Sequence, residues 1–226
     1  MRPAIVLLLL FTLARPGLCT PTAWREAKIA RLLALLESKR GDPQVLLSLG
    51  CEYVHLADET EQAETLALAR KYVSMALDAD PNGAEPLAWL GVFHCLEAKF
   101  GGGGASAKSL ALQGLKELDS AVARDPDHLT AVMMRATVCL RVPKEWGRVP
   151  RARDDLLKME LTLRRYPDRI KKFDLAMDEV YFRLGQALHA SGETTAALVA
   201  WKKATQVTPR GRYATEAHRS LRRYGP

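Results

Sequence analysis

The chain has 226 residues, of which 48% are apolar and 26% are charged, and its formal net charge is +7. This balance excludes an intrinsically disordered chain and a polytopic membrane protein, and the length suits one domain or a short array of repeats. The basic residues are densest at 210–223, which suits a solvated face or, as an alternative, an anionic lipid or acidic partner.

An apolar run of 11 residues, Ala4–Ala14, follows the basic N-terminus. It is too short to span a bilayer but is typical of the hydrophobic region of a secretory signal. Gly17 and Cys19 supply small residues three and one positions before Thr20, so we predict a signal peptide at residues 1–19. An exported protein rarely meets nucleic acid, so we expect no nucleic-acid partner.

Two alternatives to this cleavage stay open. Cleavage after Ala14 would leave Arg15 at the start of the mature chain. In the other alternative, Cys19 is the acylated N-terminal cysteine of a bacterial lipoprotein, although Leu18 stands where a small residue is usual. We expect membrane association only in that case.

An amphipathic segment follows at Ala23–Lys39, and its apolar residues share one helical face: Ile29, Leu32, Leu33 and Leu36. Thr20-Pro21-Thr22 provides the chemistry of a helix start, and Gly41-Asp42-Pro43 stops the helix. We expect this leading helix to shield the first of several packed helix pairs from water.

From this point prolines recur at intervals of 38 to 45 residues: Pro43, Pro81, Pro126, Pro167 and Pro209. An alanine stands five residues before three of them, at Ala76, Ala121 and Ala204, so the helical phase ahead of the proline is kept. Proline cannot continue a helix, so each one ends a unit. The spacing predicts helical repeats at about residues 43–81, 84–126, 129–167 and 178–211.

The first part of each unit repeats a pattern of apolar residues, a small residue and an aromatic residue. The pattern consists of Leu46, Leu49, Gly50 and Tyr53 in the first unit, and of Leu87, Leu90, Gly91 and His94 in the second. His94 replaces the usual aromatic residue, so we expect a packed core histidine. The third unit is degraded to Val132, Ala136 and Cys139, with Arg135 in place of leucine and Asp155 in place of a small residue.

Three insertions interrupt the pattern. Gly101–Gly104 is a run of glycines that no helix favours, so it predicts a flexible loop inside the second unit. Val142–Pro150 carries Trp146, which we expect either to clamp the end of the helix pair or to be an exposed binding anchor. Asp168–Met177 precedes the last unit.

The segment Asp178–Gly211 is the most regular unit, with two short amphipathic runs broken at Ser191-Gly192. Nine of its residues match a helix-turn-helix pattern with a period of about 34 residues: Tyr181, Leu184, Gly185, Leu188, Gly192, Ala197, Trp201, Ala204 and Pro209. On these positions the unit resembles the tetratricopeptide repeat (TPR). A single unit cannot bury its outer faces, so further copies are expected upstream, and Tyr213–Arg223 is expected to be a closing helix.

The resemblance covers about residues 23–223. It implies an all-α, TPR-like α-solenoid of about four helix pairs, with a leading helix and a C-terminal capping helix, in one domain at 20–226. In TPR arrays the first helices line a concave groove, and the resemblance places partner contacts at fixed positions of each helix. In this chain those positions include Leu47, Cys51, Val54, His55, Ala88, Val92, Cys95, Met133, Thr137, Arg141, Glu179, Phe182, Gln186 and His189.

These groove positions are unusually apolar. Six of them would expose a continuous apolar strip unless a peptide helix, an acyl chain or another segment of the chain covers it: Leu47, Val54, Val92, Met133, Leu140 and Phe182. The alternative, to which we give equal weight, is that tight curvature of the superhelix buries this strip inside the array. The polar residues expected to recognise a partner are His55, Arg141, Glu179 and His189.

No catalytic constellation stands out. The sequence lacks a glycine-rich phosphate loop with lysine, H-E-x-x-H, C-x-x-C and G-x-S-x-G. Cys51, Cys95 and Cys139 have no metal-ligand spacing and are expected to be buried small residues. We expect no catalytic residue, cofactor or metal, and only the pairs His55–Glu85 and His189–Glu179 would suit an enzyme.

The resemblance implies a scaffold rather than an activity. We expect a non-enzymatic scaffold or adaptor that binds a protein or peptide partner in the cell envelope of a Gram-negative bacterium. The expected location is the periplasm, with a lipid-anchored or extracellular protein as alternatives. The alternative function, which the apolar groove positions motivate, is a lipid- or small-molecule-binding accessory protein of a periplasmic transport system.

Overall fold

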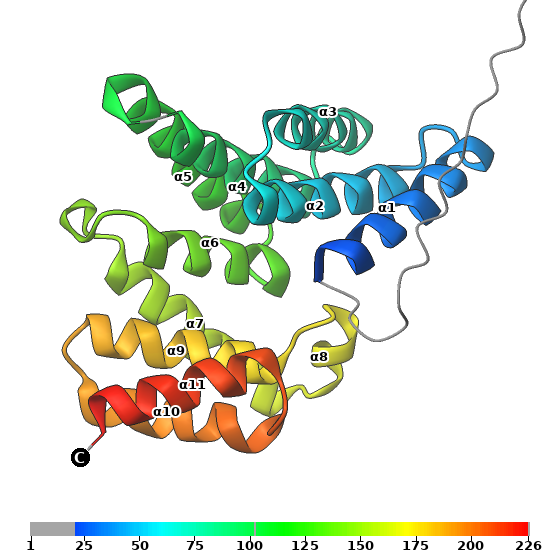
Figure 1. Cartoon of the computed structure of the whole chain (residues 1–226). Helices are drawn as coiled ribbons and strands as arrows, with labels where there is room; N and C mark the ends of the chain where they lie inside the picture. Colours follow the sequence, from blue (N-terminus) through cyan, green and yellow to red (C-terminus); the bar gives the residue numbers. More distant parts are fainter. Residues whose placement is uncertain (1–20, 102, 226) are drawn as a thin grey trace, which may run out of the picture.

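The computed structural model describes residues 21–101 and 103–225, which form a curved stack of helices (Figure 1). Within these residues there is no β-strand. The 3-10 turn η1 (Lys144–Trp146) separates α6 and α7. The helices are α1 (Pro21–Ser38), α2 (Pro43–Thr60), α3 (Ala63–Ala79), α4 (Ala84–Phe100), α5 (Gly104–Arg124), α6 (Leu129–Arg141), α7 (Val149–Arg165), α8 (Asp168–Lys172), α9 (Met177–Ala190), α10 (Thr194–Val207) and α11 (Arg212–Tyr224).

Four helix pairs make up the stack: α2 with α3, α4 with α5, α6 with α7, and α9 with α10. The first helices contact one another in succession, from α2 to α4 to α6 to α9, so the pairs are stacked along an array rather than closed into a bundle. Helix α1 packs on α2, and α11 packs on α9 and α10. This confirms the predicted all-α solenoid with a leading and a capping helix.

Side chains next to the predicted chain breaks fix where the first helices begin. Asp42 caps α2, because its Oδ1 accepts hydrogen bonds from the backbone N–H groups of Gln44 and Val45 at 2.9 and 3.2 Å. His128 caps α6 in the same way, since its Nδ1 accepts a hydrogen bond from the N–H of Ala131 at 3.4 Å. Each of these helices therefore starts directly after the turn that leads into it.

Glycines set how closely the two helices of a pair approach. A Cβ atom on Gly114 of α5 would lie 2.5 Å from the carbonyl oxygen of Gly91 on α4. In the last pair, a Cβ atom on Gly185 would lie 2.4 Å from the ring of Trp201, whose Nε1 donates a hydrogen bond to the carbonyl of Phe182 at 3.1 Å. No side chain fits at either glycine without moving its neighbour, which is the physical reason for the small residues in the pattern.

The residues beyond the 34-residue period mostly lengthen the helices. Helices α2 and α3 have 18 and 17 residues, whereas α9 and α10 have 14 each. The glycine loop is shorter than predicted, because α4 continues to Phe100 and α5 already begins at Gly104, where φ is 86°. Glycine adopts this backbone conformation without the strain that another residue would incur.

The insertion before the last pair folds back onto the third pair. Phe173, which follows α8, packs edge-on against the ring of His128, with the ring centroids 5.2 Å apart. Arg169 on α8 lies 3.4 Å from a carboxylate oxygen of Asp127. Helix α8 is thus held against the start of α6.

Among the residues that the structure describes, no helix has both the length and the apolar character needed to cross a membrane. The predicted signal peptide at residues 1–19, with Cys19 at its end, lies outside the described part of the chain. Its cleavage and any acylation therefore stay predictions.

Candidate functional site: the concave face

The first helices α2, α4, α6 and α9 carry all the predicted groove residues. The apolar members are not exposed: Leu47 keeps 7% of its accessible surface, Val54 2%, Met133 9% and Phe182 8%, and Ala88 is fully buried. Val92 and Leu140 are half-buried. Four of the six strip residues are therefore buried inside the stack, so the structure favours the second of the two alternatives.

Two ion pairs show how tightly the array curves. Arg141 Nη1, at the end of α6, lies 3.5 Å from Asp58 Oδ2 on α2, although a whole helix pair separates them along the chain. Lys99 of the intervening α4 donates a hydrogen bond to Asp58 at 3.1 Å, which raises the pKa of Lys99. Lys99 and Arg141 are largely exposed, so these pairs contribute little to stability. Their geometry nevertheless shows that α2, α4 and α6 lie close together at these residues.

His55 is exposed on the face of α2. Its ring lies edge-on to Trp89, with the centroids 5.2 Å apart. Desolvation by the surrounding protein lowers the pKa of His55, and the positive charge of Arg25 lowers it further. Arg25 reaches over from α1 and bonds Glu52 and Glu59 at 2.5 and 3.0 Å. His55 is therefore a neutral hydrogen-bonding group at pH 7.

The capping helix covers part of α9. The ring of Tyr224 lies against that of His189, with the centroids 4.1 Å apart, and the Nδ1 atom of His189 is buried without a hydrogen-bond partner among the described residues. Glu179 pairs with Arg183 at 2.6 Å and not with His189. Of the four polar residues expected to recognise a partner, His55 and Arg141 are thus the exposed ones.

The remaining groove residues are half-buried and line the face between these points. They are Cys51, Val92, Cys95, Thr137 and Gln186. The structure therefore brings the predicted set together on one side of the solenoid but leaves only its polar and small members accessible to a partner.

The histidines have partners other than those considered for catalysis. His128 Nε2 lies 3.5 Å from a carboxylate oxygen of Glu85, the residue considered as a catalytic partner of His55. His94, expected to be a packed core residue, instead shares a hydrogen bond of 2.6 Å between its Nδ1 and Glu117 Oε2. Both histidines therefore link neighbouring helices.

The three cysteines of the described chain are free thiols. Burial raises the pKa of Cys95 to about 12 and that of Cys139 to about 11, and it raises the pKa of Cys51 well above its ordinary value. All three are protonated at neutral pH, so none is an activated nucleophile. No group of His, Cys, Asp and Glu within residues 21–101 and 103–225 could hold a metal ion.

A hollow of about 580 Å³ lies outside the groove, between α5 and the loop at 142–148. Its lining consists of Leu112, Leu115, Lys116, Asp119, Ser120, Ala123, Trp146 and Arg148. Arg148 donates a hydrogen bond to Asp119 at 2.7 Å, and Trp146 is half-buried against the core. Of the two roles considered for Trp146, the structure supports the clamp.

A buried ion pair between Arg135 and Asp155 was not predicted. Arg135 Nε and Nη2 donate to the two carboxylate oxygens of Asp155 at 2.8 and 2.7 Å. Each residue departs from the repeat pattern in the third unit. The contact could have been predicted from the sequence, because the two residues that break the repeat pattern in this helix pair have opposite charges.

No protein-family model matches the sequence, and no curated protein matches it closely enough to be a relative. The crystal structure of a thermophilic TPR protein from Thermus thermophilus superposes on this chain with a TM-score of 0.67 and 16% sequence identity. The superposition covers 87% of this chain and 90% of the Thermus chain. Similarity at this low identity shows the fold alone, so the chain has the TPR-like fold that its last repeat resembles.

Proposed function

We propose that this protein is a non-enzymatic scaffold that holds a peptide segment of a partner protein on its concave face. The TPR-like fold supports a role in protein interaction. The observation that carries the proposal is that three of the four first helices keep an accessible or half-accessible polar side chain on this face: His55 on α2, Thr137 and Arg141 on α6, and Gln186 on α9.

These side chains suit a polar peptide better than an acyl chain. The Thr137 hydroxyl and the Gln186 amide each donate and accept hydrogen bonds, as a peptide backbone requires. Arg141 is 63% exposed and its contact with Asp58 is weak, so a carboxylate of a partner can replace Asp58. Because four of the six strip residues are buried, the groove offers no continuous apolar surface for a lipid.

The groove can be tested with charged substitutions at accessible positions. Thr137→Arg combined with Gln186→Arg places two bulky charges on the concave face. As a matched control, Leu161→Arg with Val199→Arg adds the same charges on the second helices α7 and α10, where these side chains are 61% and 55% exposed. Met133 and Phe182 are unsuitable, because a charge at a buried position would test folding rather than binding.

Both variants serve as baits for proteins from an envelope extract. We expect the groove variant to lose a protein that the unaltered chain and the control variant recover in equal amounts. Equal recovery by the groove and control variants would contradict the proposal, once circular dichroism has shown that both remain helical.

We also propose that the protein is exported and works in the periplasm. The apolar run Ala4–Ala14 and the small residues Gly17 and Cys19 support this proposal. Expression of the full chain in a Gram-negative host, followed by mass spectrometry of the N-terminal peptide, tests it. We expect a periplasmic chain that begins at Thr20. An acylated Cys19 would indicate a lipid anchor, and a cytoplasmic chain that retains the leader would contradict export.

A further inference from the structure

The positive charge of the chain is concentrated at its C-terminal end. Residues 164–226 contain 13 of the 33 Lys and Arg residues but only 6 of the 26 Asp and Glu residues, a formal net charge of +7. Residues 20–163 contain 18 basic and 20 acidic residues, a net charge of −2. The net charge therefore differs strongly between the two ends of the solenoid.

Helix α11 arranges part of this charge in a stripe, which we call the arginine stripe: Arg212, Arg219, Arg222 and Arg223. Arg212, Arg219 and Arg223 fall within about 40° of one another on a helix of 3.6 residues per turn, and the stripe is about 16 Å long. The opposite side of α11 is packed, with Ala214 and Ala217 fully buried. Arg212, Arg219 and Arg223 therefore lie on the side of α11 opposite its buried alanines, and Arg222 lies about 60–100° around the helix from them.

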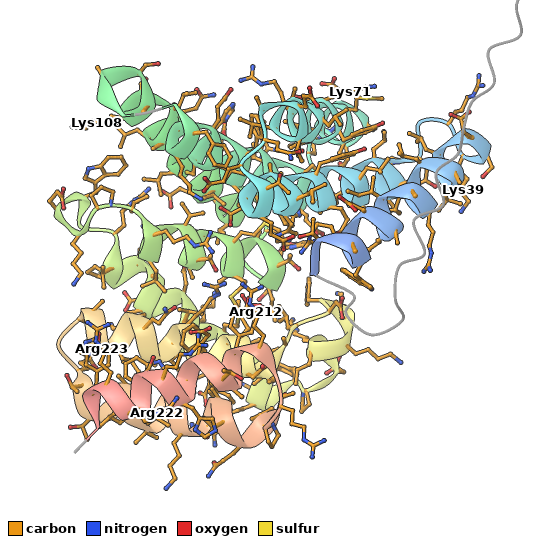
Figure 2. All side chains as sticks on the ribbon, in the orientation of Figure 1. Lys39, Lys71, Lys108, Arg212, Arg222 and Arg223 are labelled. Atoms are coloured by element: carbon orange, nitrogen blue, oxygen red, sulfur yellow. The ribbon has the colours of Figure 1, made fainter. Side chains whose placement is uncertain are left out.

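Most of the positive charge of the arginine stripe is not neutralised by acidic side chains of the protein. Arg212, Arg222 and Arg223 are exposed and have no acidic partner among the described residues, and only Arg219 pairs with Glu216, at 2.7 Å. Figure 2 shows Arg212, Arg222 and Arg223 projecting from α11 at the C-terminal end of the stack. The other labelled bases, Lys39, Lys71 and Lys108, lie apart from one another in the first half of the chain.

The stripe lacks the apolar centre that a protein interface needs. Stable protein interfaces are built around buried aromatic or aliphatic anchors, and charged residues are depleted from their cores. Within the described chain, none of the large apolar side chains that are exposed belongs to α11. An exposed row of guanidinium groups instead matches a surface of phosphate groups, since guanidinium binds phosphate in a bidentate manner.

We propose that the arginine stripe of α11 binds the phosphate groups of an anionic lipid bilayer and turns the C-terminal end of the solenoid toward the membrane. The choice of lipid over nucleic acid rests on the proposed export of the protein, because phospholipid is the extended phosphate surface outside the cytoplasm. Helix α11 adsorbs without insertion, since its apolar side is packed against α9 and α10. Each basic residue near an anionic surface strengthens binding by about fivefold, so three charges correspond to about a hundredfold.

The experiment is sedimentation of the chain from residue 20 with two kinds of vesicle, one of phosphatidylcholine alone and one of phosphatidylcholine mixed equally with phosphatidylglycerol. The test variant is Arg212→Gln/Arg222→Gln/Arg223→Gln. The matched control is Lys39→Gln/Lys71→Gln/Lys108→Gln, which removes the same charge from exposed residues elsewhere. All six side chains are exposed, so both variants are expected to fold.

We expect the unaltered chain to bind the anionic vesicles alone, and less tightly as salt is added, because salt screens exposed charges. The α11 variant should bind about a hundredfold more weakly, whereas the control variant should lose less than about fivefold. No binding of the unaltered chain, an equal loss in both variants, or tighter binding to duplex DNA or polyglutamate than to the vesicles would overturn the proposal. Since the assay contains no partner protein and starts from the mature chain, its failure would leave the groove and export proposals standing.

Discussion

Arg135 on α6 holds both carboxylate oxygens of Asp155 on α7, and both residues are buried. Burial alone would lower the pKa of Arg135, but the hydrogen bonds and the charge of Asp155 outweigh it and raise the pKa above its ordinary value. Asp119 on α5 adds a second carboxylate 3.5 Å from the same guanidinium. The degraded third repeat is therefore a repeat in which an ion pair replaces a leucine and a small residue.

This pairing predicts a non-additive mutant cycle. Asp155→Ala leaves a buried guanidinium without its main partner and should lower the free energy of unfolding by about 3 kcal/mol. The double variant Arg135→Leu/Asp155→Ala restores the apolar pattern of the other repeats. Its free energy of unfolding should therefore lie within about 1 kcal/mol of that of the unaltered chain. Urea unfolding followed by circular dichroism measures both values.

An exposed pair provides the control for this cycle. Arg153 on α7 lies 2.8 Å from Glu193 in the next unit, and both side chains are in solvent. Arg153→Ala should leave the unfolding midpoint unchanged. A double variant at 135 and 155 that is as unstable as the single variant would mean that the two residues do not compensate each other.

The close contact between α4 and α5 predicts that two Gly→Ala substitutions differ in their effect on the free energy of unfolding. A Cβ at Gly114 would lie 2.5 Å from Gly91 O and 2.6 Å from Cys95 Sγ, so Gly114→Ala should cost about 1–3 kcal/mol of unfolding free energy. At Gly101, where φ is −70° and the nearest atom is 3.5 Å away, alanine should be tolerated. Thermal unfolding of the two variants tests this difference, and equal stability would contradict the close approach of the helices.

The environment of His55 predicts the sign of a pH effect. Desolvation, aided by Arg25, lowers its pKa in the folded chain, whereas the unfolded chain keeps a value near 6.5. As the pH falls through 6.5, the unfolded chain takes up the proton first, so this contribution to stability is complete above pH 6.5 and is lost below it. His55→Gln should remove this loss.

Proton NMR of the imidazole gives the folded pKa directly. A midpoint below 6.5 is expected, and a midpoint above 6.5 would mean that the negative charges of Glu52, Glu59 and Asp58 outweigh desolvation and Arg25.

The raised thiol pKa values predict slow alkylation of the native protein. Cys95 and Cys139, with pKa values of about 12 and about 11, have almost no thiolate at pH 8, and the pKa of Cys51 is raised in the same direction. Iodoacetamide should therefore modify all three far more slowly than free cysteine, and urea should remove the difference. Rapid native modification at one site, located by peptide mass spectrometry, would contradict the burial of that thiol.

The pairing of helices could be predicted from the sequence because it depends on residues close together in the chain. Gly185 and Trp201 lie within one unit, and their contact fixes the distance between α9 and α10. The same local rule placed Gly91 against α5, where the small residue is Gly114. Such contacts recur in each repeat, so a periodic pattern records them.

The exposure of the groove could not be predicted in the same way. Burial of Met133 and Phe182 depends on how far each helix pair rotates relative to the next, and no residue within a unit records this rotation. His189 is covered by Tyr224, whose position depends on how α11 packs on α9. The repeat pattern therefore identified the face but not the part of it that a partner can reach.

The central claim is that the concave face contacts a partner protein, and site-specific photo-crosslinking tests it most directly. A photoreactive amino acid replaces Gln186 in the groove or, as the control, Val199 on the outer helix α10, and each protein is irradiated in cells. We predict a discrete crosslinked protein from position 186 that is absent from position 199. A crosslink from position 199 alone, with none from position 186, would contradict the claim.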